Sequence, residues 1–198
     1  MTTVSYVINL TNHFLIAMPG LEDGIFSKSV VFMCEHSSHG ALGLVINKPS
    51  DINLKHLFDK VDLPLRREDL VLAPVYQGGP VQTERGFVLH ETMLAQPEAV
   101  ETVYASTMKI PGGLEMTTSK DVLEALSSGA GPRHVFVSLG YSAWGEGQLE
   151  AEIADNNWLT VDADRAVIFD TPIDQRYGRA LSLLGLQAWM LSSEAGHA

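Results

Sequence analysis

Residues 134–152, HVFVSLGYSAWGEGQLEAE, constrain the fold of this chain more than any other segment. An apolar run with the composition of a strand meets a turn rich in glycine and aromatic residues, and a run of helical character follows. This order places polar and aromatic side chains at the carboxyl edge of a sheet, beside the start of a helix. Open α/β sheets bind ligands at such places. The segment therefore predicts a site, although it does not specify a reaction.

The composition indicates one globular domain. The chain has 198 residues, of which 45% are apolar and 19% are charged, and this suffices for one packed core. We expect a single domain over residues 1–198, and a small subdomain inserted around residues 50–75 is an alternative. The net charge of −11 repels phosphate backbones, and no basic cluster exceeds the pair Arg66–Arg67. Direct DNA binding is therefore disfavoured.

The sequence also predicts the cellular location of the protein. The first ten residues lack the basic start and the cleavage site of a signal peptide, and no apolar run approaches the roughly 18 residues that span a bilayer. The single cysteine, Cys34, excludes an intramolecular disulfide framework and fits a reducing compartment. We expect a soluble cytoplasmic protein without a membrane segment.

The secondary-structure pattern predicts an α+β fold. Strands outnumber helices and often follow one another directly, which favours a mixed, mainly antiparallel β-sheet flanked by a few short helices, in a compact three-layer-like α/β sandwich. The charged stretch that ends at Asp69 is predicted to be a flexible loop. The expected strands are 14–18, 29–34, 41–47, 70–76, 86–90, 103–110, 114–117, 158–161 and 167–169, and the expected helices include 53–61, 122–126 and 174–184.

Cys34-Glu35-His36 is the first candidate for chemistry. Side chains alternate along a strand, so Cys34 and His36 are expected on the same side, where an imidazolium would stabilise a thiolate. The favoured alternative is that Cys34 is a small core residue and that His36 belongs to a turn. A metal site of Cys34, His36 and His39 lacks a second ligand cluster, so we expect no metal there. We also expect no cofactor.

The turn after the run at 134–139 supplies a second set of candidates. Gly140-Tyr141-Ser142-Ala143-Trp144 does not match the G-x-S-x-G elbow of serine hydrolases, because Trp144 stands where the second glycine is required. The segment also lacks the Lys-Ser/Thr pair of a P-loop. Ligand binding by Tyr141, Ser142, Trp144 and Gln148 remains one interpretation. Equally favoured is a purely structural turn with aromatic side chains packed over the sheet edge.

A third cluster follows Gln77. The backbone amides of Gly78-Gly79, together with Arg85 and His90, would suit a carboxylate or a phosphate. The favoured alternative is a simple turn between strands, with Arg85 in a structural ion pair.

A series of short motifs runs along the chain: HFLIAMP at 13–19, SVV at 29–31, CEH at 34–36, INKP at 46–49, GGP at 78–80, RGF at 85–87, LH at 89–90, TTS at 117–119, LGY at 139–141, Trp144, GQLE at 147–150, NWL at 157–159 and GHA at 196–198. The order of these motifs resembles the YqgE/AlgH family from about His13 to the last residue. The resemblance implies a cytosolic bacterial protein of compact α/β type, without an established reaction or cofactor. One branch of the family that this chain resembles is linked by name to transcriptional control of alginate synthesis. No helix-turn-helix pattern is visible in this sequence, however. Two small departures are Ala143, where glycine is frequent, and Arg176-Tyr177, where Arg-Trp is more usual.

These observations favour a non-enzymatic binding or regulatory protein. Its cleft would be formed by residues 34–36, 78–90 and 139–148, and would hold a small anionic or aromatic ligand or a peptide of a partner protein. Arg85 would supply charge, and Tyr141 and Trp144 would supply stacking surface. One alternative is a cysteine-dependent enzyme or redox sensor, with Cys34 as the reactive thiol and His36 as its activator. A second alternative is a transcriptional regulator associated with nucleic acid.

Overall fold

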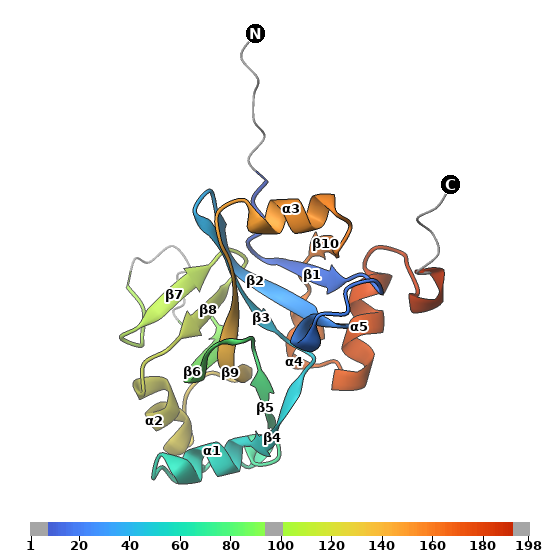
Figure 1. Ribbon diagram of the computed structural model, residues 1–198. Helices are drawn as coiled ribbons and strands as arrows, with labels where there is room; N and C mark the ends of the chain where they lie inside the picture. Colours follow the sequence, from blue (N-terminus) through green and yellow to red (C-terminus); the bar gives the residue numbers. More distant parts are fainter. Residues whose placement is uncertain (1–7, 94–100, 192–198) are drawn as a thin grey trace, which may run out of the picture.

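The computed structural model describes residues 8–93 and 101–191, and one curled ten-stranded sheet organises them (Figure 1). The strand order is β10-β1-β2-β3-β9-β6-β8-β7; β5 joins this path by pairing with β9, and β4 pairs with β5. The strands are β1 His13–Ala17, β2 Val30–Ser37, β3 Gly40–Val45, β4 Pro49–Asn53, β5 Pro74–Gln77, β6 Val81–Glu91, β7 Thr107–Ile110, β8 Leu114–Thr117, β9 Val135–Trp144 and β10 Trp158–Asp162. The helices are α1 Leu54–Lys60, α2 Asp121–Ser127, α3 Gln148–Ala154, α4 Arg165–Phe169 and α5 Ile173–Ser182, and the 3-10 turns are η1 Gly24–Phe26, η2 Glu68–Leu70 and η3 Ala188–Met190.

Strand β9 joins three groups of strands that otherwise pair only among themselves. Its last residues pair antiparallel with β3, in a register that includes Ala41 opposite Trp144. Its middle pairs in parallel with β5, with Tyr76 opposite Ser138, and its other edge pairs antiparallel with β6. The groups are β10-β1-β2-β3, β4-β5 and β6-β8-β7. The sheet is therefore one body only because β9 is long enough to reach all three.

The sheet is buried on both faces. Along β2, Val30 and Phe32 enter the first core together with α4 and α5, whereas Val31 and Met33 enter the second core, which α3 covers. The third core lies on the face opposite the first, around Val88 and Val137, under α1 and α2. Burial on both faces explains why β2 reads as a continuous apolar run and not as an alternating one.

The α+β class and the mixed, mainly antiparallel sheet are confirmed. The sheet curls into a half-barrel, so the five helices do not form the flat layers of the predicted three-layer-like sandwich (Figure 1). Among residues 8–93 and 101–191, no helix combines the length and the apolar character that crossing a membrane requires. The GHA motif at 196–198 lies outside the described residues.

The predicted strand at 167–169 is wrong, because these residues belong to helix α4. The Asp164 side chain accepts a hydrogen bond from the amide of Ala166 at 3.0 Å, which is the pattern of a helix N-cap. The cap and the first-core contacts of Val167 and Ile168 outweigh the strand propensity of Val, Ile and Phe.

The turn after β5 lies directly against β9, where glycine is required. A Cβ atom on Gly140 would lie 2.5 Å from the carbonyl oxygen of Gly79, and Gly140 has a φ of +76°. A Cβ atom on Gly79 would lie 2.1 Å from the carbonyl carbon of Tyr141. Only glycine allows the two backbones to approach this closely.

We predict that Gly140→Ala lowers the free energy of unfolding by about 3 kcal/mol or more, since it adds both a backbone clash and left-handed strain. Gly178→Ala is the control, because Gly178 lies in α5 and an alanine methyl there would meet no atom within 4 Å beyond its own helix backbone. It should raise stability by about 1 kcal/mol. Urea unfolding of both variants measures the two effects, and an equally stable Gly140→Ala variant would contradict the prediction.

Candidate functional site

Cys34 and His36 lie on opposite faces of the sheet, so the expected shared side is wrong. The register between β2 and β3 shifts between Met33 and Glu35, which inserts Cys34 as an extra residue and reverses the alternation after it. Cys34 is 2% exposed and belongs to the first core. Burial, and secondarily the nearby Glu35 carboxylate, raise the pKa of the Cys34 thiol far above its ordinary value.

His36 is held by hydrogen bonds on its own side of the sheet. Its Nδ1 accepts the amide proton of Leu10 at 3.0 Å, so Nε2 carries the proton that is donated to Glu150 at 2.6 Å. The ring therefore joins the segment before β1 to helix α3. These hydrogen bonds indicate a structural role for His36.

Arg85 is exposed on β6. Its guanidinium donates to Gln82 and to Thr118, and it lies 5.8 Å from the ring of Phe87. Within the described residues, no carboxylate lies within 4 Å of Arg85, so the alternative of a structural ion pair is not observed. Tyr141 packs edge-on against the same Phe87 ring, with the centroids 5.2 Å apart.

The remaining residues of the strand-turn-helix segment have local roles. Ser142 is buried and donates to the carbonyl oxygen of Gly78. Trp144 is buried in the second core, in an aromatic cluster with Phe26 and Trp158. The Gln148 side chain accepts from the amide of Gly145, at the start of α3.

His90 is fully buried beside an unusual carboxylate. Its Nδ1 donates to the carbonyl oxygen of Glu91, and its Nε2 contacts the Thr117 hydroxyl at 2.8 Å. Glu115 lies opposite His90 in the β6–β8 register, with 4.0 Å between Oε2 and Nδ1. Both of its carboxylate oxygens lack a hydrogen-bond partner among the residues that the structure describes.

The residues expected to form one cleft line separate hollows. Residues of the 35–42 and 141–144 stretches, Tyr141 and Trp144 among them, line a shallow hollow of about 290 Å³. Residues of the 84–88 stretch line a separate cleft of about 200 Å³ near α1 and α2. In the part of the chain that the structure describes, Cys34, Arg85, His90 and Trp144 do not line one cavity.

A different cavity, of about 470 Å³, combines a buried charge with aromatic walls. It lies where η2, β5 and the start of β9 face α4 and α5. Its walls are mostly apolar or aromatic, and its polar members are an arginine, a threonine and two aspartates. The lining residues are Leu54, Asp69, Leu70, Ala73, Pro74, Tyr76, Val135, Phe136, Val137, Ile168, Phe169, Asp170, Thr171, Pro172, Ile173 and Arg176.

Arg176 is the distinctive member of this cavity. It is 4% exposed, its Nε donates to the carbonyl oxygen of Thr171 at 2.9 Å, and its Nη1 donates to that of Ile46 at 2.6 Å. Its guanidinium carbon lies 5.1 Å from the centroid of the Tyr76 ring. No carboxylate of the described chain lies within 4 Å of it.

Arg176 therefore keeps donors that the described protein does not use. A guanidinium has five N–H donors. Two of them bond to backbone carbonyl oxygens and one is close enough to hydrogen-bond with the Tyr76 hydroxyl, which leaves two without a partner among the residues that the structure describes. Burial lowers the pKa of Arg176, and the neighbouring Tyr76 opposes this effect. An arginine nevertheless stays protonated in proteins. The cavity thus carries a permanent buried positive charge with no carboxylate of the described residues within 4 Å of it.

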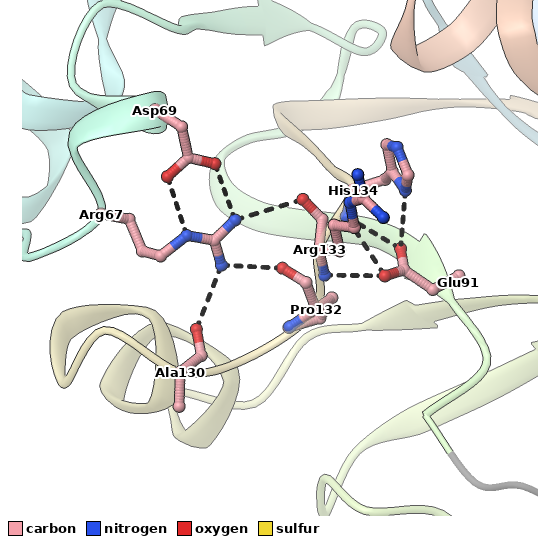
Figure 2. Close-up of polar contacts among 7 residues, drawn as sticks. All are labelled: Arg67, Asp69, Glu91, Ala130, Pro132, Arg133 and His134. Carbon is pink, nitrogen blue, oxygen red and sulfur yellow. Dashed lines mark hydrogen bonds and ion pairs between the residues drawn. The ribbon is translucent and has the colours of Figure 1, made fainter.

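Arg67 fixes the wall of the cavity at η2 (Figure 2). Its guanidinium binds both oxygens of Asp69, at 2.9 and 2.8 Å, and also donates to the carbonyl oxygens of Ala130, Pro132 and Arg133. The stretch predicted as a flexible loop is therefore anchored to the connection between α2 and β9. Hydrogen bonding to Arg67 lowers the pKa of Asp69, so this carboxylate is both ionised and paired.

None of the residues selected from the sequence lines this cavity. Arg176 could have been found from one signal. The apolar side of α5 repeats at Ile173, Tyr177, Ala180 and Leu181, and Arg176 occupies a position on the same stripe. A charged residue on a buried helical stripe is unusual unless it has a buried partner or a function.

Comparison with known proteins identifies the family. The family model described as DUF179: AlgH-like matches residues 14–189. A UPF0301 protein of Polaromonas sp. (strain JS666 / ATCC BAA-500) is 79% identical over the full length of both chains, and one of Variovorax paradoxus (strain S110) is 72% identical, also over the full length of both. The solution structure of the AlgH protein from Pseudomonas aeruginosa has a TM-score of 0.75 and 44% identity, with all of both chains covered. A crystal structure of a protein from Corynebacterium diphtheriae, 20% identical over 87% of this chain and 85% of that one, shares the fold with a TM-score of 0.68. The chain therefore belongs to the AlgH-like family, the UPF0301 or YqgE/AlgH proteins, a family of unknown function.

Proposed function

We propose that this protein is a non-enzymatic binding protein, and that its ligand carries an anionic group held by Arg176. The observation that carries the proposal is the buried guanidinium that lines a cavity and has no carboxylate within 4 Å among the described residues. A buried charge without a counter-ion costs several kcal/mol. An anionic ligand would offset this cost and would use the N–H groups of Arg176 that have no partner among the described residues.

The shape and the lining of the cavity support a small molecule. The volume of about 470 Å³ lies in the range of small-molecule sites, and such sites combine apolar walls with a few polar groups. The sequence favoured an anionic or aromatic ligand held near Arg85, Tyr141 and Trp144. We retain the anionic ligand that the sequence favoured, but place its binding site at Arg176.

The alternatives have less support. A cysteine-dependent enzyme requires an accessible thiolate, whereas Cys34 is buried and His36 lies on the other face of the sheet. A nucleic-acid-associated regulator requires a basic surface, which a net charge of −11 does not favour. We also propose a cytoplasmic location, on the ground that Cys34 is a free thiol.

The proposal predicts saturable anion binding at the cavity. In a ¹H–¹⁵N correlation spectrum, acetate, phenylacetate, inorganic phosphate and phenyl phosphate are each added up to about 10 mM, which detects millimolar dissociation constants. At least one of them should shift the amide signals of Asp170, Thr171 and Ile173, which line the cavity. Arg176→Met should abolish the shifts.

Arg179→Met is the matched control, because Arg179 lies on α5, is exposed and does not line the cavity. It should bind as the wild type does. If Arg176→Met fails to fold, Arg176→Lys replaces it, since lysine keeps the charge but loses the planar fork. Binding that survives Arg176→Lys and Arg176→Met unchanged, or an absence of binding by all four anions, would refute the site.

The thiol is predicted to be unreactive in the folded protein. Burial raises the pKa of Cys34, so the thiolate that would attack an alkylating reagent is scarce at neutral pH and is also inaccessible. Between pH 6 and about 9, iodoacetamide should therefore alkylate Cys34 only at urea concentrations that unfold the protein. Below the unfolding transition, no reaction is expected. Rapid alkylation of the native protein near pH 7 would restore the cysteine-dependent alternative.

A further inference from the structure

We infer that the ligand of the Arg176 cavity is a monocarboxylate with an apolar or aromatic body, and not a phosphorylated molecule. The inference rests on the proposed function and adds the chemical class of the ligand. Three features of the cavity carry it: the balance of charge, the composition of the walls and the free edge of the guanidinium.

The balance of charge favours a single negative charge. Three charged residues line the cavity, namely Arg176, Asp69 and Asp170. The Asp69 carboxylate is neutralised by its bidentate contact with Arg67. Asp170 makes no ion pair with any residue that the structure describes. The charges of Arg176 and Asp170 sum to zero, so a carboxylate ligand leaves the site with one uncompensated negative charge. A phosphate monoester dianion would leave two, and its second charge would meet Asp170 without a second cation.

The walls favour an apolar body. Tyr76 and Phe136 stack with their centroids 4.2 Å apart, and Phe169, Ile168 and Leu70 line the cavity with them. Contact with such surface strengthens binding in proportion to the apolar area that is removed from water. A bare inorganic anion would gain none of this contact.

The free edge of Arg176 matches a planar anion. Nε and Nη1 are directed to backbone carbonyls, which fix the plane of the guanidinium. Of the three other N–H groups, one is within hydrogen-bonding reach of the Tyr76 hydroxyl, and two remain for the ligand. Arginine binds carboxylates in this planar, two-point manner.

Four probes at pH 8 test the inference, because a phosphate monoester is then mainly a dianion. The probes are acetate, phenylacetate, inorganic phosphate and phenyl phosphate, titrated into the full chain and followed by the amide signals of Asp170 and Thr171. Phenylacetate should bind at least about tenfold more tightly than acetate, and at least about tenfold more tightly than phenyl phosphate. Arg176→Lys should weaken phenylacetate binding by about tenfold, whereas Arg179→Lys should not.

A pair of aspartate variants tests the role of charge directly. Asp170→Asn should strengthen phenyl phosphate binding several-fold relative to phenylacetate. Asp174→Asn should leave the ratio unchanged, because Asp174 lies at the start of α5 but lines a different hollow.

Each outcome has a distinct meaning. If phenyl phosphate binds through Arg176 as tightly as phenylacetate does, the carboxylate assignment is overturned while the proposed function stands. If phenylacetate gains nothing over acetate, the apolar body is overturned. If no probe binds, the proposed function itself fails.

Discussion

The pairing of β9 with three different strands is the constraint on which the rest of the structure depends. Each of its partners belongs to a separate group, and β5 and β3 pair with different stretches of β9, at Ser138–Leu139 and at Ser142–Trp144. This sharing requires the turn after β5 to lie directly against the β9 backbone, at Gly79 and Gly140. The same strand supplies Phe136 to the wall of the Arg176 cavity. The site is thus built on the strand that unites the sheet.

Arg176 links this architecture to the candidate function. Its two hydrogen bonds to backbone carbonyls join α5 to the residue that follows β3 and to the connection between α4 and α5. Those bonds would be available to a neutral donor as well, and a neutral donor would avoid the cost of burying a charge. The contact of the guanidinium with the Tyr76 ring offsets only part of that cost, because no carboxylate of the described residues lies within 4 Å of Arg176. A ligand anion would offset the rest.

The fold was more predictable from the sequence than the candidate site, because continuous apolar runs such as those around Phe32 and Leu89 report burial directly. The sequence does not show which distant strands pair, and the register shift beside Cys34 leaves no local signal. Glycine and aromatic residues in turns drew attention to side chains with structural roles, such as Trp144. Arg176 lies in a helix of ordinary appearance, and its significance comes from the counter-ion that its described neighbours do not provide. That can be recognised only when the neighbours are known.

The late position of β9 along the chain has a consequence for synthesis in the cell. Strands β3, β5 and β6 are made well before β9, and until it appears each keeps an edge unpaired. Open edges invite pairing with other chains, and contacts between distant residues form slowly. Before β9 is synthesised, the nascent chain therefore contains three incomplete groups of strands that lack their common pairing partner. A chain truncated before β9 would present these edges permanently, and aggregation is the outcome that its topology favours.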